Sequence, residues 1–144
     1  MLVDSHCHLA GEEFAADLAP VVARAKAAGL GRLLCIISSD TAEELTQAEG
    51  VREAWPAGEF ATAIHPHRAG AYAGRIGEAQ QVVREAAARL GAVLLGEMGL
   101  DYHYDFAPRD VQQQVFAAQL AVARALDLPI AIHTREAADD TFAI

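Results

Sequence analysis

Two histidines that lie two residues apart, His6 and His8, follow the apolar start of the chain. We predict a strand over Leu2–His6, and side chains two positions apart on a strand share one face. Two neutral imidazoles side by side can chelate a divalent transition metal. Glu97 and His133, each directly after a later apolar run, are further candidate ligands. These residue types indicate the chemistry of a metal-dependent hydrolase.

The acidic residue Glu97 carries more weight than the histidine pair, because a pair of nearby histidines is by itself a weak signal. Glu97 follows the apolar run at residues 93–95. A carboxylate in that position would be costly to bury unless a cation neutralised it. We therefore interpret Glu97 as a metal ligand.

Apolar runs of strand length alternate with longer amphipathic segments along the chain, which is typical of repeated β/α units. The runs are mostly apolar without alternation, as expected of parallel strands buried on both faces. The predicted strands lie near Leu2–His6, Arg32–Ile37, Phe60–His65, Val93–Met98 and Pro129–His133. The candidate ligands fall at the C-terminal ends of these strands, where parallel α/β folds carry their chemistry.

The segments between the strands predict four helices and the beginning of a fifth. They cover Asp17–Ala28, a segment that starts at Thr41, Ile76–Leu90, a segment after Pro108, and a last one from Glu136. Thr41 and Glu44 have the spacing of a capping box. The fourth helix has an apolar stripe that we assign to the core: Val111, Val115, Ala118, Val122 and Leu126.

These elements predict an α/β fold of the (β/α)8 TIM-barrel type, present here as an incomplete barrel. A closed barrel needs ~250 residues. We expect one domain over residues 1–144, with about five strands and four to five helices and truncated at its C-terminus. A half-barrel leaves two sheet edges unpaired and apolar surface uncovered, so it should associate. Self-association, pairing with a missing C-terminal half and a compact inactive fragment are all compatible with the sequence.

The composition sets limits on location and partners. The net charge of −9 arises from 11 basic and 20 acidic residues, so no global basic field attracts nucleic acid. A bound divalent cation can reverse the sign of a small acidic site, and a phosphodiester substrate is therefore not excluded. No apolar run approaches the ~20 residues that cross a bilayer, and no signal-peptide pattern opens the chain. We expect a cytoplasmic protein without a membrane partner, and its two cysteines, Cys7 and Cys35, to be reduced.

Four sequence blocks resemble the TatD family of metal-dependent deoxyribonucleases, within the wider amidohydrolase-like group of barrel hydrolases. The blocks are Asp4–His8, Ile64–His67, Gly96–Asp105 and Pro129–Arg135. Their order and spacing match the N-terminal portion of the family across essentially the whole chain. The resemblance implies that His6, His8 and Glu97 hold one metal ion. It also implies that Glu97 bridges to a second ion, to which His133 contributes, and that a metal-activated hydroxide cleaves phosphodiester bonds of DNA.

Further residues of these blocks are candidates for contact with substrate. The resemblance places His65 at the active site, and we expect a role in phosphate binding or proton transfer, with packing at the strand end as the alternative. His67 is a substrate-binding candidate that could equally be a solvated loop residue. Arg135 could present its planar donors to a phosphate. The alternative for Arg135 is a salt bridge to Glu136 or Asp139.

Tyr102 belongs to an aromatic cluster with His103 and Tyr104 that could stack on nucleobases, since every base offers a π-face. Packing under the barrel mouth is the alternative for the same cluster. The ligand types suit Zn, Mn, Ni or Fe, with Mg at a weaker site. Two other functions stay open: a non-catalytic fragment or subunit of such an enzyme, and a related barrel hydrolase that cleaves an amide or ester.

Overall fold

The computed structural model describes residues 1–104 and 106–144, so Asp105, the last residue of the third family block, lies outside the described residues. Its five strands form one sheet in sequence order, and every neighbouring pair is parallel. The strands are β1 (Leu2–Cys7), β2 (Leu30–Ser38), β3 (Glu59–Ala63), β4 (Leu94–Asp101) and β5 (Ile130–Arg135). This arrangement confirms the predicted α/β class and the incomplete barrel.

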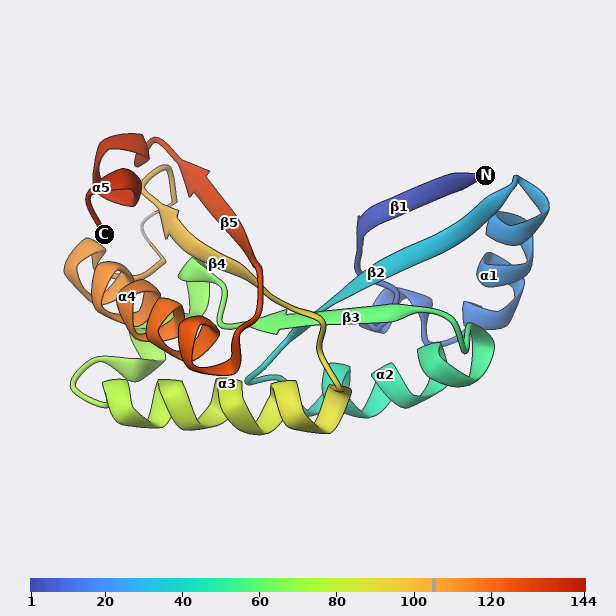
Figure 1. Ribbon diagram of the computed structural model, residues 1–144, viewed down its shortest axis with the longest axis horizontal. Coiled ribbons are helices and arrows are strands. Elements are labelled where there is room, and N and C mark those ends of the chain that lie inside the picture. The colour runs from blue at the N-terminus through green and yellow to red at the C-terminus, as the bar shows by residue number, and fades with distance from the viewer. Residues whose placement is uncertain (105) are drawn as a thin grey trace.

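Helices α1 to α4 connect successive strands and lie on the convex side of the curved sheet, and α5 follows β5 (Figure 1). They are α1 (Leu18–Ala27), α2 (Ala42–Ala54), α3 (Ile76–Leu90), α4 (Arg109–Leu126) and α5 (Ala138–Ala143), with short 3-10 helices η1 (Glu12–Phe14) and η2 (Pro66–Tyr72). The last helix begins two residues later than predicted, because Glu136 adopts a left-handed backbone with φ of 53°. Over residues 1–104 and 106–144, no helix combines the length and the apolar character needed to cross a membrane.

The predicted capping box at the start of α2 is wrong. Thr41 occupies the N-cap position but its side chain makes no capping hydrogen bond. Glu44 instead accepts a hydrogen bond of 2.8 Å from the backbone N–H of Ser38, at the end of β2. Thr41 and Glu44 have the spacing of the motif, but the Glu44 carboxylate bonds to the backbone at the end of β2 and not to the backbone of the N-cap residue.

The core consists of two apolar clusters between the sheet and its helices. One lies under β3, β4 and β5 and contains Met98, Leu100 and Phe116. The other lies under β1, β2 and β3 and contains Ile37 and Phe60. At the two outer strands large apolar side chains are exposed: Leu2, Val3, Ile130 and Ile132. Cys7 and Cys35 are free thiols, as expected.

Candidate active site

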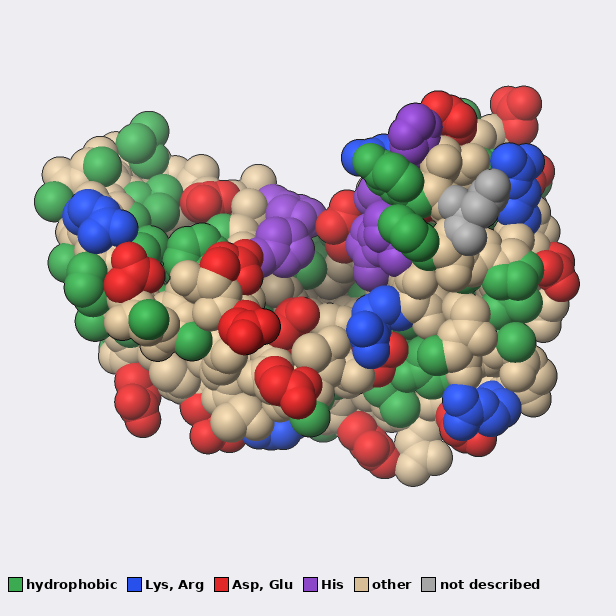
Figure 2. Space-filling view, turned by 180° about the vertical axis from the view of Figure 1, so that it is seen from behind, with side chains coloured by type: hydrophobic (Ala, Val, Ile, Leu, Met, Phe, Trp, Pro, Cys, Tyr) green, Lys and Arg blue, Asp and Glu red, His purple; other side chains and the backbone are tan. Residues whose placement is uncertain are grey.

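The candidate ligands meet at the C-terminal ends of four strands. His6 lies near the end of β1 and His8 just beyond it, while His65 directly precedes η2 after β3. Glu97 lies within β4 and His133 within β5. Figure 2 shows a hollow in the surface with histidine side chains on both of its flanks. The fold thus brings together the residues that the sequence separates by up to 127 positions.

One group of possible metal ligands joins β1 to β4. The two Nε2 atoms of His6 and His8 lie 3.2 Å apart. His6 Nε2 also lies 3.3 Å from Oε2 of Glu97. Ligand atoms bonded to one metal ion at about 2.0–2.2 Å are separated by roughly 3 Å. The three side chains therefore fit a single cation.

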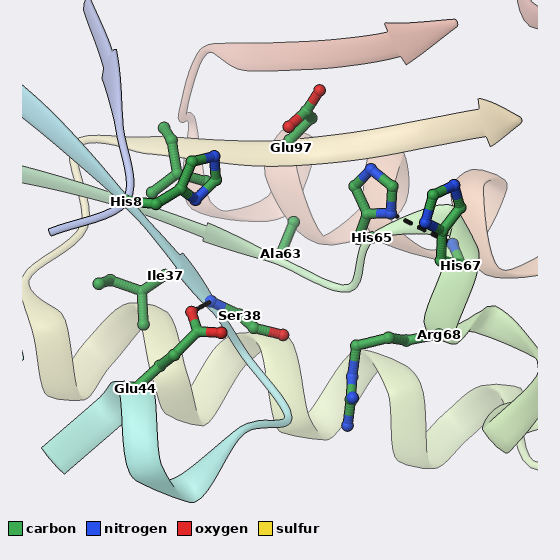
Figure 3. Close-up of a pocket in the computed structure, with 10 residues that line it drawn as sticks. His8, Ile37, Ser38, Glu44, Ala63, His65, His67, Arg68 and Glu97 are labelled. Carbon is green, nitrogen blue, oxygen red and sulfur yellow. Dashed lines mark hydrogen bonds between the residues drawn. The ribbon is translucent and has the colours of Figure 1, made fainter. Parts of the chain in front are cut away.

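A second group shares the same glutamate. Oε1 of Glu97 lies 2.9 Å from Nδ1 of His133. His65 also offers a ring nitrogen, and one ligand atom from each of these three residues lies within 4.8 Å of the others. The two oxygens of Glu97 thus face two different sets of donors, which is the arrangement a bridging carboxylate requires. In Figure 3, Glu97 extends from β4 into the space between His8 and His65.

The backbone of β4 is irregular where it carries Glu97. The register with β5 shifts between Leu95 and Met98, so three residues of β4 advance while β5 advances two. Such a bulge re-aims a side chain relative to a regular strand. Gly99 has φ of 143°, and a Cβ there would collide with the carbonyl oxygen of His133. The glycine therefore lets β4 and β5 approach closely beside the donors.

Asp101 contacts the candidate site through two histidines, and the sequence reasoning did not single it out. Its side chain is fully buried. Oδ2 lies 2.8 Å from His67 Nε2 and 3.0 Å from His133 Nε2. Oδ1 accepts hydrogen bonds from the backbone N–H groups of His103 and Tyr104, both at 3.1 Å. The signal was present, since Asp101 follows the apolar pair at residues 99–100 just as Glu97 follows an apolar run.

The bonds of Asp101 determine its own ionisation. Burial would raise its pKa, but hydrogen bonds with His67, the Tyr104 amide and His133 outweigh burial and lower the pKa below its ordinary value. Asp101 is therefore ionised at neutral pH. For Glu97 the same balance holds: burial raises the pKa, while the hydrogen bond with His133 and the nearby His6 lower it overall.

An ionised Asp101 fixes the proton of His133. A carboxylate only accepts hydrogen bonds, so Nε2 of His133 must carry its hydrogen toward Asp101. Nδ1 of His133 then faces Glu97, where it donates to the carboxylate if it carries a hydrogen and offers a lone pair if a cation takes the place of that hydrogen. Two acceptor atoms 2.9 Å apart repel each other unless a proton or a cation lies between them. A carboxylate, a histidine and a metal arranged in this way are a recurrent feature of metal sites.

His65 differs from the other histidines in its bonding. Its Nδ1 accepts a hydrogen bond of 3.2 Å from the backbone N–H of His67. Burial, together with the neighbouring His67 and His133, lowers the pKa of His65 to about 4. The ring is therefore neutral at pH 7, with its hydrogen on Nε2. That N–H is a donor, which suits contact with a phosphate oxygen and leaves His65 no free lone pair for a metal, so Glu97 and His133 are the better ligand candidates of the second group.

Two buried glutamines of α4 hold the strand ends in place. Gln119 donates to the carbonyl of Ile64 at 3.0 Å and accepts from its N–H at 2.8 Å, directly before His65. Gln112 forms the same pair of bonds with Asp101, at 3.0 and 2.8 Å. The two glutamines are seven residues apart and so lie on one face of the helix. They supply backbone hydrogen bonds beyond the point where the pairing of β3 with β4 ends.

The three predicted substrate-binding residues have different environments. Tyr102 is buried, and its hydroxyl donates to Asp140 at 2.6 Å, which argues against the predicted contact with substrate. His67 is not a free loop residue, because Asp101 holds its ring. Arg135 forms no salt bridge with Glu136 or Asp139, its expected partners, and instead lies 3.9 Å from Asp101. Its guanidinium is half-exposed beside the site.

A cavity of about 250 Å³ extends from the donors toward the end of β2. Figure 3 shows Glu97 and the imidazoles at one end and Ser38, Glu44 and Arg68 at the other. Arg68 donates to Asp40 at 2.7 Å through Nε, which fixes its position at the cavity wall. The cavity therefore combines imidazole, carboxylate and guanidinium groups around one opening.

Known proteins resemble this chain over its whole length. The family model of the TatD-related DNases matches residues 3–144. The metal-dependent hydrolase YabD of Bacillus subtilis, described as uncharacterized, is 37% identical over 144 residues, which are 100% of this chain and 54% of that protein. A protein named 3′-5′ ssDNA/RNA exonuclease TatD from Pantoea sp. (strain At-9b) is 38% identical over 99% of this chain and 54% of its own length.

Solved structures show the same relationship. The crystal structure of YJJV, a TatD homologue from Escherichia coli, superposes with a TM-score of 0.77 at 27% identity, over 97% of this chain and 53% of that one. A TatD-family hydrolase from Entamoeba histolytica has the same fold, with a TM-score of 0.77 at 18% identity over 99% and 52% of the two chains. This chain thus spans about half the length of the relatives it matches. It belongs to the family of TatD-related DNases.

Proposed function

We propose that this chain carries the metal-binding half of a divalent-metal-dependent phosphodiesterase that hydrolyses DNA. The observation that carries the proposal is the position of Glu97, whose two carboxylate oxygens face separate donor groups at 3.3 and 2.9 Å. The chemistry of these donors suits two divalent ions. The names of the relatives, a metal-dependent hydrolase and a 3′-5′ ssDNA/RNA exonuclease, support the same reaction class.

In this proposal a bound divalent ion supplies Lewis acidity and lowers the pKa of water. The side chains of the chain bind and orient the substrate. His65 donates its Nε2–H to a phosphate oxygen, because its Nδ1 is engaged by the backbone of η2. Arg135 adds a half-exposed guanidinium, which can pair with a neighbouring phosphate.

The test of the bridge is Glu97→Ala. The purified chain and this variant are compared for Mn²⁺-dependent hydrolysis of a single-stranded DNA octamer and for bound metal by mass spectrometry. We expect the variant to lose hydrolysis and most of its bound metal, since both donor groups lose their shared carboxylate. Glu78→Ala, which removes an exposed glutamate of α3, is the matched control and should leave both quantities unchanged.

Two results would contradict the proposal. Unchanged metal content and hydrolysis in Glu97→Ala would exclude a bridging role for this residue. A wild-type chain that binds two metal ions but cleaves esters or amides in place of phosphodiesters would show that the reaction class is wrong.

A further inference from the structure

Tyr104 and Phe106, in the connection between β4 and α4, form an exposed aromatic pair that we name the aromatic ledge. Their rings are nearly parallel, at 14°, with centroids 5.4 Å apart. Tyr104 is 40% exposed and Phe106 is 65% exposed, although both are large apolar side chains. Tyr102 in the same connection is buried. The connection thus packs one aromatic ring inward and leaves two on the surface.

The ledge lies against the candidate active site. The ring of His67 meets both aromatic rings edge-on, with its centroid 5.5 Å from that of Tyr104 and 4.8 Å from that of Phe106. His67 is bonded to Asp101, which also holds His133. His67 therefore connects the ledge to the candidate site, both directly to His65, with ring centroids 4.3 Å apart, and through Asp101 to His133. Figure 2 shows hydrophobic side chains next to histidines on one flank of the hollow.

The ledge is held in place although it is exposed. The guanidinium carbon of Arg135 lies 5.3 Å from the centroid of the Tyr104 ring, within the range of a cation–π interaction. The backbone N–H of Tyr104 donates to the buried Asp101. Phe106 stacks on Tyr104 and meets the edge of His67, so its ring is fixed on two sides. A fixed and exposed aromatic surface of this kind suits stacking with a flat ligand.

We propose that the aromatic ledge stacks on an unpaired nucleobase of a single strand, next to the phosphodiester that is cleaved. The inference rests on the proposed function, because the stacked base belongs to the strand whose phosphodiester is cleaved. Every base has a π-face, and stacking on protein aromatics tolerates any sequence. A base within a duplex is already stacked on both faces, so the ledge selects single strands. No basic surface is needed for this contact, in agreement with the net charge of −9.

The test compares two octamers that share one phosphorothioate backbone, which resists hydrolysis: one of thymidylate and one abasic at every position. Binding is measured by fluorescence anisotropy in the presence of Mn²⁺. We expect the wild-type chain to bind the thymidylate octamer about tenfold more tightly than the abasic one. Phe106→Ala should bind both octamers with the weaker, abasic affinity, and Phe106→Trp should restore the difference.

Phe142→Ala is the matched control, because it removes an exposed phenylalanine of α5 that is not part of the ledge. This variant should discriminate between the octamers as the wild type does. Tyr104→Leu, which keeps an apolar side chain but removes the ring, should reduce the discrimination as well. An octamer of deoxyuridylate should also bind more tightly than the abasic one, since uracil offers the same pyrimidine ring without the methyl group.

The outcomes separate this inference from the proposed function. If the wild type hydrolyses natural DNA but Phe106→Ala still prefers the base-bearing octamer tenfold, the ledge inference is wrong and the hydrolase stands. If the wild type binds neither octamer and hydrolyses no DNA, both proposals are overturned. Equal binding of the two octamers by an active wild type would also exclude base stacking at the ledge.

Discussion

Among the single side chains of the site, Asp101 makes the contacts that orient the others. It is buried, accepts from two backbone N–H groups, and receives the Nε2 atoms of two histidines on one oxygen. Asp101 therefore fixes the orientation and the proton of His133, which is the side chain that a cation would contact. Asp101 itself would not contact the cation. Such supporting residues affect metal affinity without being ligands.

We predict that Asp101→Asn weakens metal binding by about 10- to 100-fold. The amide replaces an acceptor oxygen with a donor, so an amide N–H₂ facing His133 favours the tautomer with its hydrogen on Nδ1, and the nitrogen that faces Glu97 then has no lone pair for a metal. Titration of the metal-free chain with Mn²⁺ or Zn²⁺ by calorimetry measures the affinity, and the ¹⁵N shifts of the His133 ring report the tautomer.

The matched control is Asp110→Asn, which alters an exposed aspartate in the first turn of α4. It should change neither the affinity nor the ring shifts. If Asp101→Asn folds normally and binds metal like the wild type with His133 in its original tautomer, the positioning role of Asp101 is refuted.

Helix α4 supports the strand ends of the site in addition to the strand pairing. The pairing of β3 with β4 ends at Thr62, although Ala63 still pairs with Ser38 of β2. Gln119 provides two further bonds to Ile64, and Gln112 does the same for Asp101. Helix α4 thus restrains the backbone directly before His65 and at Asp101.

We predict that Gln119→Leu lowers the free energy of unfolding by about 2–4 kcal/mol. Leucine fits the volume but leaves a buried N–H and a buried carbonyl of Ile64 without partners, and each such group costs about 1–3 kcal/mol. Urea denaturation followed by circular dichroism measures the change. Gln81→Leu on the exposed face of α3 is the control and should stay within about 0.5 kcal/mol of the wild type. A comparably small effect of Gln119→Leu would show that the two bonds do not stabilise β3.

The strands and helices could be predicted from the sequence because apolar runs and helical spacing are local signals. The positions of His6 and His133 near their strand ends were predictable in the same way, since parallel strands present their C-terminal ends on one side. Glu97 instead lies within β4, which continues to Asp101, three residues beyond the predicted end at Met98. The bulge at Glu97 was not predictable, because it depends on the register between β4 and β5.

The glutamines of α4 could not be found in the same way. Gln112 and Gln119 look like polar positions beside an apolar stripe, and their burial follows only from where the strand ends lose their partners. Tyr102 and Tyr104 are likewise of the same residue type and lie two positions apart, so the sequence does not distinguish them. Only the folded connection shows which ring is buried.

At the scale of the whole molecule, charge makes any binding of nucleic acid depend on metal. The chain has a net charge of −9, and Glu97 adds a carboxylate to the hollow, with the buried Asp101 behind His67 and His133. Near the cavity the basic side chains are Arg68, which Asp40 neutralises, and Arg135. A phosphate backbone is therefore repelled by the chain unless bound cations reverse the local sign.

We predict that removing divalent ions with EDTA weakens binding of the phosphorothioate thymidylate octamer by more than tenfold while the chain stays folded. With Mn²⁺ present, the affinity should fall only weakly with added salt. About two arginine contacts correspond to a slope of about −1.4 in log affinity against log salt for a single strand. Anisotropy titrations between 50 and 200 mM salt, with and without EDTA, measure both quantities, and circular dichroism checks the fold. Tight binding in EDTA with a steep salt dependence would instead locate the nucleic acid on a basic surface away from the hollow, and would separate binding from the metal centre altogether.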